Sequence, residues 1–128
     1  MKAVIPCAEK DKNLFPFSES KPTALMPVMG KPLIKHNIEA LKQNGVEKVY
    51  IVANHLEEMF EKEFDSREDV EIVHQEDLDG TASAIETCSF IEDDFIVING
   101  DVTVSERDIG KILDKFRETG ETSILATD

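Results

Sequence analysis

The chain is poor in glycine and in basic residues, and both shortages narrow the classes of protein it can belong to. It has six glycines in 128 residues, and none of them comes before Gly30. Fourteen lysines and arginines stand against 27 acidic residues, which gives a net charge of −13. So acidic a surface argues against nucleic-acid binding, which relies on Lys and Arg contacts to phosphates, and against anionic membranes. Solubility is the plainest reason for the charge, and an acidic interaction surface is the alternative.

Cysteines and long apolar runs are also scarce. Cys7 and Cys88 belong to no CxxC or Cys/His cluster, which argues against a zinc site and a disulfide framework. We therefore expect a reduced, cytoplasmic setting. No apolar stretch approaches the ~20 residues of a membrane span, and no signal peptide is evident. With 41% hydrophobic residues, residues 1–128 are enough for one domain with a core.

Short β-branched runs alternate with segments of helical spacing. The predicted strands are Ala3–Ile5, Val49–Val52, Val70–Val73, Phe95–Ile98 and Ser123–Ala126. Apolar spacing predicts helices around residues 33–41, 56–64 and 109–116, and a shorter helix that starts near Gly80. This alternation predicts an α/β fold, an open, doubly wound, mainly parallel Rossmann-like sheet with helices on both faces. Because the chain stops just after a strand, we expect a truncated domain.

Two helix ends carry their own signals. Asn44 and Gly45 follow the first apolar-periodic segment and predict its end. Ser105 precedes the last segment and is a typical N-cap.

Ligands of such sheets bind at the carboxyl ends of the strands. One candidate there is Asp101, which follows an apolar strand and an Asn-Gly turn. A carboxylate at that position suits Mg²⁺, which prefers one or two carboxylates together with phosphates. The alternative is a turn aspartate that caps the next segment.

A second candidate is the stretch from Gln75 to Thr81. The Gln75 amide offers both a donor and an acceptor, which suits the edge of a nucleobase. Gly80 permits close approach of the backbone, and the start of the following helix favours an anion. An ordinary loop with an N-cap is the alternative.

The third candidate is the proline-rich stretch before the first helix. Pro22, Pro27 and Pro32 predict a rigid, extended path, with Pro32 near the first turn of the helix. Lys21 and Lys31 are candidates for phosphate contacts on this path. The alternative is a stiff loop with solvated lysines.

Together, these stretches resemble one family, the sugar-1-phosphate nucleotidyltransferases. The segments that carry the resemblance, in family order and spacing, are MKAVIPCA, PFSESKPTALMPVMGKPLIKHNIEAL, NGVEKVYIVANH, QEDLDGTASAI and FIVINGD. The resemblance implies transfer of a nucleoside monophosphate from a triphosphate to a sugar 1-phosphate, which gives an NDP-sugar and pyrophosphate. It also implies Gln75 at the base, Ala8, Gly80 and Thr81 beside the nucleotide, and Asp101 as a Mg²⁺ ligand.

The first loop departs from the family pattern, which reads roughly Gly-x-Gly-Thr-Arg. Ala8 stands at a glycine position, Asn13 at the arginine position, and Thr23 where the family has a lysine. Two hypotheses follow: an enzyme with altered phosphate contacts, or a catalytically degenerate domain with a binding, regulatory or assembly role. An oligomer of the full-length protein fits either hypothesis. We expect no turnover from these 128 residues alone, because the family's sugar pocket and second metal carboxylate lie further along the chain.

Overall fold

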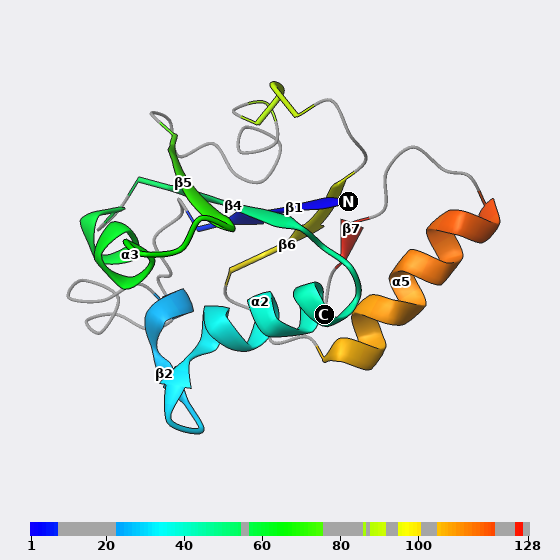
Figure 1. The fold of residues 1–128 in the computed structure, drawn as a ribbon, viewed down its shortest axis with the longest axis horizontal. Helices are drawn as coiled ribbons and strands as arrows, with labels where there is room; N and C mark the ends of the chain where they lie inside the picture. The colour runs from blue at the N-terminus through cyan, green and yellow to red at the C-terminus, as the bar shows by residue number, and fades with distance from the viewer. Residues whose placement is uncertain are drawn as a thin grey trace.

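A parallel sheet forms the centre of the molecule. The computed structural model describes residues 1–7, 23–54, 57–75, 86, 88–91, 95–100, 105–119 and 125–126. The strands are β1 (Lys2–Pro6), β4 (Lys48–Ala53), β5 (Val70–His74), β6 (Phe95–Ile98) and β7 (Leu125–Ala126). All neighbouring pairs run parallel, in the order β5-β4-β1-β6-β7 (Figure 1). The predicted parallel α/β sheet is confirmed.

The strand order reverses direction at β1. After β1, the chain adds β4 and then β5 on one side, and it returns to add β6 and β7 on the other side. The switch point of the sheet therefore lies between β1 and β6, and in sheets of this type the ligand crevice opens outside the carboxyl ends at that point.

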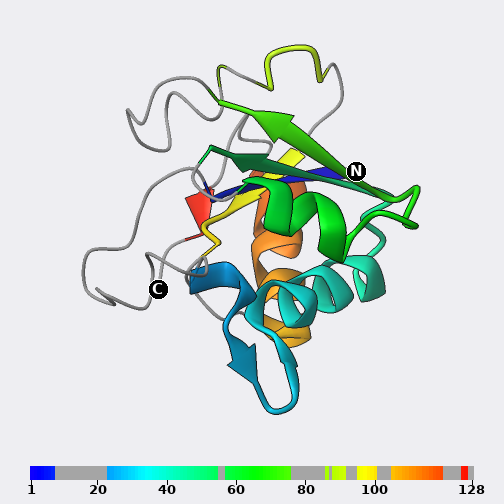
Figure 2. The same ribbon diagram turned by 90° about the vertical axis from the view of Figure 1, so that its left-hand side faces the viewer.

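The described helices cover one face of the sheet. They are α2 (Leu33–Gln43), α3 (Glu57–Glu63) and α5 (Glu106–Thr119), and they lie together below the strands in Figures 1 and 2. The predicted helix near Gly80 falls outside the described residues. Among the described residues, no helix is both long and apolar enough to cross a membrane.

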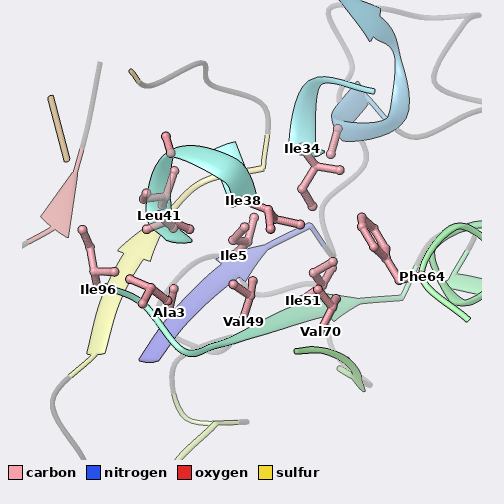
Figure 3. Close-up of a cluster of buried hydrophobic side chains, with 14 of the residues drawn as sticks. Ala3, Ile5, Ile34, Ile38, Leu41, Val49, Ile51, Phe64, Val70 and Ile96 are labelled. Carbon is pink, nitrogen blue, oxygen red and sulfur yellow. The ribbon is translucent and has the colours of Figure 1, made fainter. Parts of the chain in front are cut away.

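Strand alternation decides which side chains meet the helices. On β1, Ala3 and Ile5 join the main core with Val49 and Ile51 of β4, while Val4 points to the opposite face. Figure 3 shows that Ile34, Ile38 and Leu41 of α2 pack against these strand residues in the main core. The opposite face has a smaller cluster, made by Val4, Tyr50, Val52, Cys88 and Val97.

The predicted helix ends are confirmed. The Oγ of Ser105 accepts a hydrogen bond from the N–H of Asp108 (3.1 Å), and the Asp108 carboxylate accepts from the N–H of Ser105 (3.4 Å). Asn44 ends α2, and Gly45 follows with φ +89°. The Nδ2 of Asn44 also donates to the carbonyls of Ala40 and Glu106, both at 2.9 Å, so that this cap joins α2 to α5.

Residues 23–32 of the proline-rich stretch do not form the extended path that the sequence predicted, and Pro22 lies outside the described residues. After η2 (Thr23–Leu25), strands β2 (Pro27–Val28) and β3 (Lys31–Pro32) form an antiparallel hairpin. The chain reverses because Met29 and Gly30 both have positive φ, 51° and 88°, as a type I′ turn requires. The Nε2 of His36 in α2 donates to the carbonyl of Val28 (2.6 Å), which holds the hairpin against the helix.

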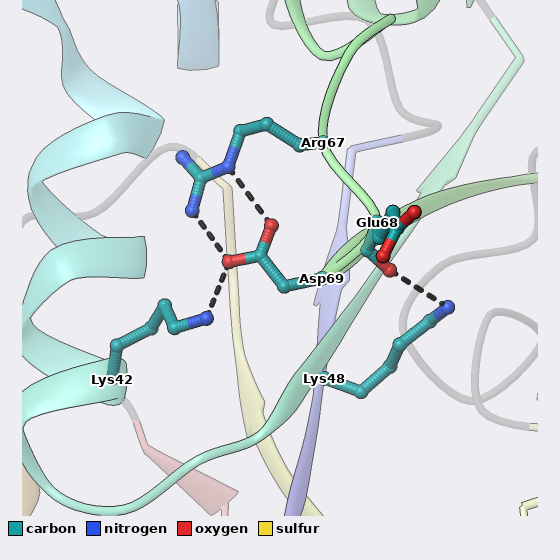
Figure 4. Close-up of polar contacts among 5 residues, drawn as sticks. All are labelled: Lys42, Lys48, Arg67, Glu68 and Asp69. Atoms are coloured by element: carbon teal, nitrogen blue, oxygen red, sulfur yellow. Dashed lines mark hydrogen bonds and ion pairs between the residues drawn. The ribbon is translucent and has the colours of Figure 1, made fainter.

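An ion-pair cluster joins α2 to the start of β5. Asp69 receives hydrogen bonds from Arg67 Nε (3.0 Å) and Nη2 (2.7 Å) and pairs with Lys42 of α2 (Figure 4). The Arg67 guanidinium, and next the Lys42 ammonium, hold the pKa of the Asp69 carboxyl well below its usual range. Lys48 donates to the main-chain carbonyl of Glu68 (3.2 Å). The cluster therefore lies at the amino end of the sheet.

Candidate nucleotide site at the carboxyl edge of the sheet

Four strands end side by side at one edge of the sheet. The last residue of each strand and the residues directly after it are Pro6–Cys7 for β1, Ala53–Asn54 for β4, His74–Gln75 for β5 and Ile98–Gly100 for β6. Since adjacent strands lie ~4.8 Å apart, Gln75 and Gly100 are roughly 14 Å apart along this edge. Gln75 and Gly100 therefore mark two separate positions along the edge.

Gly100 brings the ends of β1 and β6 into close contact at the switch point. Its N–H donates to the carbonyl of Pro6 (3.0 Å). A Cβ at position 100 would lie 2.3 Å from Cys7 Sγ and 3.1 Å from Pro6 O, so a side chain there would displace Cys7 and crowd the Pro6 carbonyl. The Asn-Gly turn predicted here therefore has a packing reason: glycine lets the two strand ends approach without displacing the Cys7 side chain.

Gln75 is buried with an unpartnered side chain. It is 2% exposed, and neither its Nε2 nor its Oε1 has a hydrogen-bond partner among the described residues. A buried amide without partners costs free energy, on the order of 1–3 kcal/mol per group. Groups of this kind are uncommon in folded proteins, and a ligand that supplies the missing bonds is one explanation for them.

Both main-chain polar groups of Gln75 form hydrogen bonds with residues at the end of β4. Its N–H donates to the carbonyl of Ala53 (3.0 Å), and its own carbonyl accepts from the Nδ2 of Asn54 (2.6 Å). The preceding residue is also held, because the Nδ1 of His74 lies 2.7 Å from the Glu57 carboxylate of α3. The unpartnered amide therefore projects from a fixed backbone. Sequence reasoning missed Asn54, whose contact joins the ends of two strands and leaves no local spacing signal.

The other predicted site residues divide into two groups. Those outside the described residues are Ala8, Lys21, Gly80, Thr81 and Asp101, together with Asn13. Lys31 is described, and its Nζ pairs with the Glu39 carboxylate of α2 at 2.5 Å, which lowers the pKa of Glu39. Its predicted phosphate contact stays a prediction.

Metal-binding groups and reactive thiols are two further kinds of functional group that the described residues could supply. Among the described residues, no group of three or more His, Cys, Asp and Glu side chains is placed to hold a metal ion. Cys88 lies within the smaller cluster, and burial, followed by the charge of Glu71, raises the pKa of its thiol to about 11. Cys7 and Cys88 are not joined in a disulfide.

The parallel sheet, with its strand order β5-β4-β1-β6-β7 and its switch point between β1 and β6, defines a Rossmann-like α/β domain. The chain belongs to the Nucleotidyl transferase family, whose profile matches residues 2–128. The predicted family is thereby confirmed.

Three comparisons illustrate the relationship. The chain is 42% identical over 115 residues to the bifunctional protein GlmU of Methanococcus maripaludis, a match that covers 89% of the chain and 28% of the relative. It is 30% identical over 122 residues to the UTP–glucose-1-phosphate uridylyltransferase AglF of Haloferax volcanii, with 92% of the chain and 50% of the relative covered. The structure of HddC from Yersinia pseudotuberculosis complexed with GMP-PN superposes with a TM-score of 0.75 at 25% identity, over 90% of the chain and 53% of HddC. The chain thus spans about half, or less, of the length of these proteins.

Proposed function

We propose that the chain forms the nucleotide-binding part of an enzyme that transfers a nucleoside monophosphate from a nucleoside triphosphate to a sugar 1-phosphate. In this reaction an oxygen of the sugar phosphate attacks the α-phosphorus. The bond to the β-phosphate breaks, and an NDP-sugar and pyrophosphate form. A reduced, cytoplasmic setting is part of the same proposal.

The unpartnered amide of Gln75 is the observation that carries the proposal. Its Nε2 is a donor and its Oε1 an acceptor, and the edge of a nucleobase presents the complementary pair. A base bound there would remove the cost of leaving the amide unpaired. The AglF relative is named for UTP and glucose 1-phosphate, and HddC was solved with GMP-PN, which supports a nucleotide as the ligand.

The phosphates fit the other end of the edge. Gly100 lets β1 and β6 meet at the switch point, and Asp101 follows it directly in the sequence. The carboxylate of Asp101 has the hard oxygen chemistry that Mg²⁺ prefers. Bound there, Mg²⁺ would neutralise charge on the phosphates as pyrophosphate leaves. Thr23, which stands at the family's lysine position, favours the non-catalytic alternative, whereas the Gln75 amide and the Asp101 carboxylate favour the enzyme.

Calorimetry tests the proposal directly. We expect the chain to bind at least one of UTP, dTTP, CTP, GTP and ATP in the presence of Mg²⁺. Asp101→Ala should remove the dependence of that binding on Mg²⁺. Glu68→Ala, which removes the same charge at the opposite end of the sheet, is the matched control and should keep it.

The outcome that contradicts the proposal is also clear. If none of the five nucleotides binds at millimolar concentration, the chain has no nucleotide site. For the transfer step, pyrophosphate release with a panel of sugar 1-phosphates should be measured in the protein that carries this chain. Nucleotide binding without pyrophosphate release on any sugar phosphate would favour the non-catalytic hypothesis.

A further inference from the structure

We infer that Asn54 is a positioning residue that sets nucleobase selectivity by fixing the main chain of Gln75. The inference rests on the proposed function, since it assigns Gln75 to the base. Asn54 is half-buried, directly after β4, and reaches across to the neighbouring strand end.

The bond from Asn54 extends the ladder between β4 and β5 at its end. The last registered pair is Ala53 with His74, and the N–H of Gln75 then donates to the carbonyl of Ala53. In a regular parallel ladder, the next donor to the Gln75 carbonyl would come from the backbone of the neighbouring strand. Here the side-chain amide of Asn54 supplies a donor, at 2.6 Å. Gln75 therefore keeps strand-like anchoring one residue past the end of β5.

Anchoring matters because the Gln75 amide has no hydrogen bond to any described residue. Its Nε2 and Oε1 are unpartnered among the described residues, so its direction depends on the backbone and on packing. A displacement of a bonding group by a fraction of an ångström weakens directional hydrogen bonds. Selectivity between bases rests on those bonds, whereas the triphosphate is the same in every nucleotide. Loss of the Asn54 bond should therefore reduce discrimination between bases more than it reduces phosphate binding.

The experiment compares nucleotides with inorganic tripolyphosphate. We expect Asn54→Ala to weaken binding of the preferred nucleoside triphosphate roughly 3- to 10-fold, the size of one lost hydrogen bond. The affinity ratio between preferred and poorest base should fall by a similar factor. Affinity for Mg²⁺-tripolyphosphate should stay within about twofold. Asn54→Ser retains a donor and should keep part of the selectivity.

Asn44→Ala is the matched control. Asn44 also donates its Nδ2 to main-chain carbonyls, of Ala40 and Glu106, but it does so at the C-terminus of α2, at the opposite end of the sheet. This substitution should lower the free energy of unfolding and leave the affinity ratio between bases unchanged.

A double-mutant cycle shows whether Asn54 acts through Gln75. In a Gln75→Met background, Asn54→Ala should have no further effect on nucleotide affinity. Additive effects, or an equal loss of nucleotide and tripolyphosphate binding, would overturn the positioning role and leave the proposed function in place. If the unmodified chain binds no nucleotide more tightly than it binds tripolyphosphate, both the base site at Gln75 and the role of Asn54 are wrong.

Discussion

At the scale of single residues, Gln75 combines two properties that stability alone does not favour. It is 2% exposed, and its amide makes no hydrogen bond with any described residue. An apolar side chain of the same length would pack there without an unpaired donor or acceptor. The presence of an amide is therefore better explained by a ligand than by packing.

Gln75→Met should stabilise the free protein and weaken its nucleotide binding. Replacing the amide by an unbranched apolar chain of similar volume removes two unpaired polar atoms, so the free energy of unfolding should rise by about 1 kcal/mol. Nucleotide affinity should fall about 10-fold or more. Urea unfolding and calorimetry measure the two effects.

Gln43→Met makes the same replacement at an exposed position of α2 and should change neither quantity appreciably. A loss of stability in Gln75→Met would mean that the amide is paired in the free protein, and the role of Gln75 as a base-binding group would lose its support.

At the scale of elements, the strands and helices were predictable because burial imposes a period on the sequence. Strand alternation and the three-and-four spacing of α2 and α5 come directly from which face meets the core. The hairpin of β2 and β3 was not predictable in the same way. Its turn places Met29, a residue type that rarely adopts positive φ, at 51°, so Gly30 is the one signal of this turn in the sequence.

The candidate site was predictable only in part. Gln75 was identified from its residue type and from a resemblance, but its burial and its unpaired atoms required the structure. The role of Asn54 depends on a bond between two strand ends that lie far apart in the sequence. Side-chain bonds to a distant backbone leave no periodic trace, which is why sequence reasoning missed this residue.

The contact between β1 and β6 should depend on the absence of a side chain at position 100. Gly100→Ala places a Cβ against Cys7 Sγ and Pro6 O, and we expect a loss of about 1–3 kcal/mol in the free energy of unfolding. In a Cys7→Ala background the closest contact is gone, so the loss should be smaller. Urea unfolding of the four proteins measures the difference.

Gly45→Ala is the comparison for this pair. Its cost comes from a φ of +89° and not from crowding, so it should be the same with or without Cys7→Ala. Equal costs of Gly100→Ala in both backgrounds would mean that the Cys7 side chain moves aside freely and that Pro6 sets the limit.

At the scale of the whole molecule, the carboxyl and amino ends of the strands form two edges of the sheet with different roles. The carboxyl ends carry the candidate site, and the amino ends are held by the ion-pair cluster of Lys42, Arg67 and Asp69 (Figure 4). Changes in the cluster should therefore alter stability without altering nucleotide selectivity.

Asp69→Asn should make the protein less sensitive to acid. Because the pKa of Asp69 is lower in the folded state, its contribution is present above the unfolded pKa and is lost as the pH falls through the folded value. The unmodified protein should lose about 1 kcal/mol more than Asp69→Asn between roughly pH 5 and pH 2, a modest value because the pair is partly solvated. Thermal unfolding across this range measures it.

Glu68→Gln is the matched control, because it removes a carboxylate one residue away where the structure uses only the main-chain oxygen to bind Lys48. Parallel acid profiles for the unmodified protein and Asp69→Asn would show that the cluster contributes nothing to acid stability.

The central place of β1 has a consequence for synthesis. It leaves the ribosome before both of its partner strands, which are β4, near residue 48, and β6, near residue 95. Its apolar face therefore stays exposed until most of the chain has been synthesised. Pairings between strands so distant in the sequence slow folding and increase the risk of aggregation. A strand of five residues with a lysine at its start offers little edge to other chains during that wait.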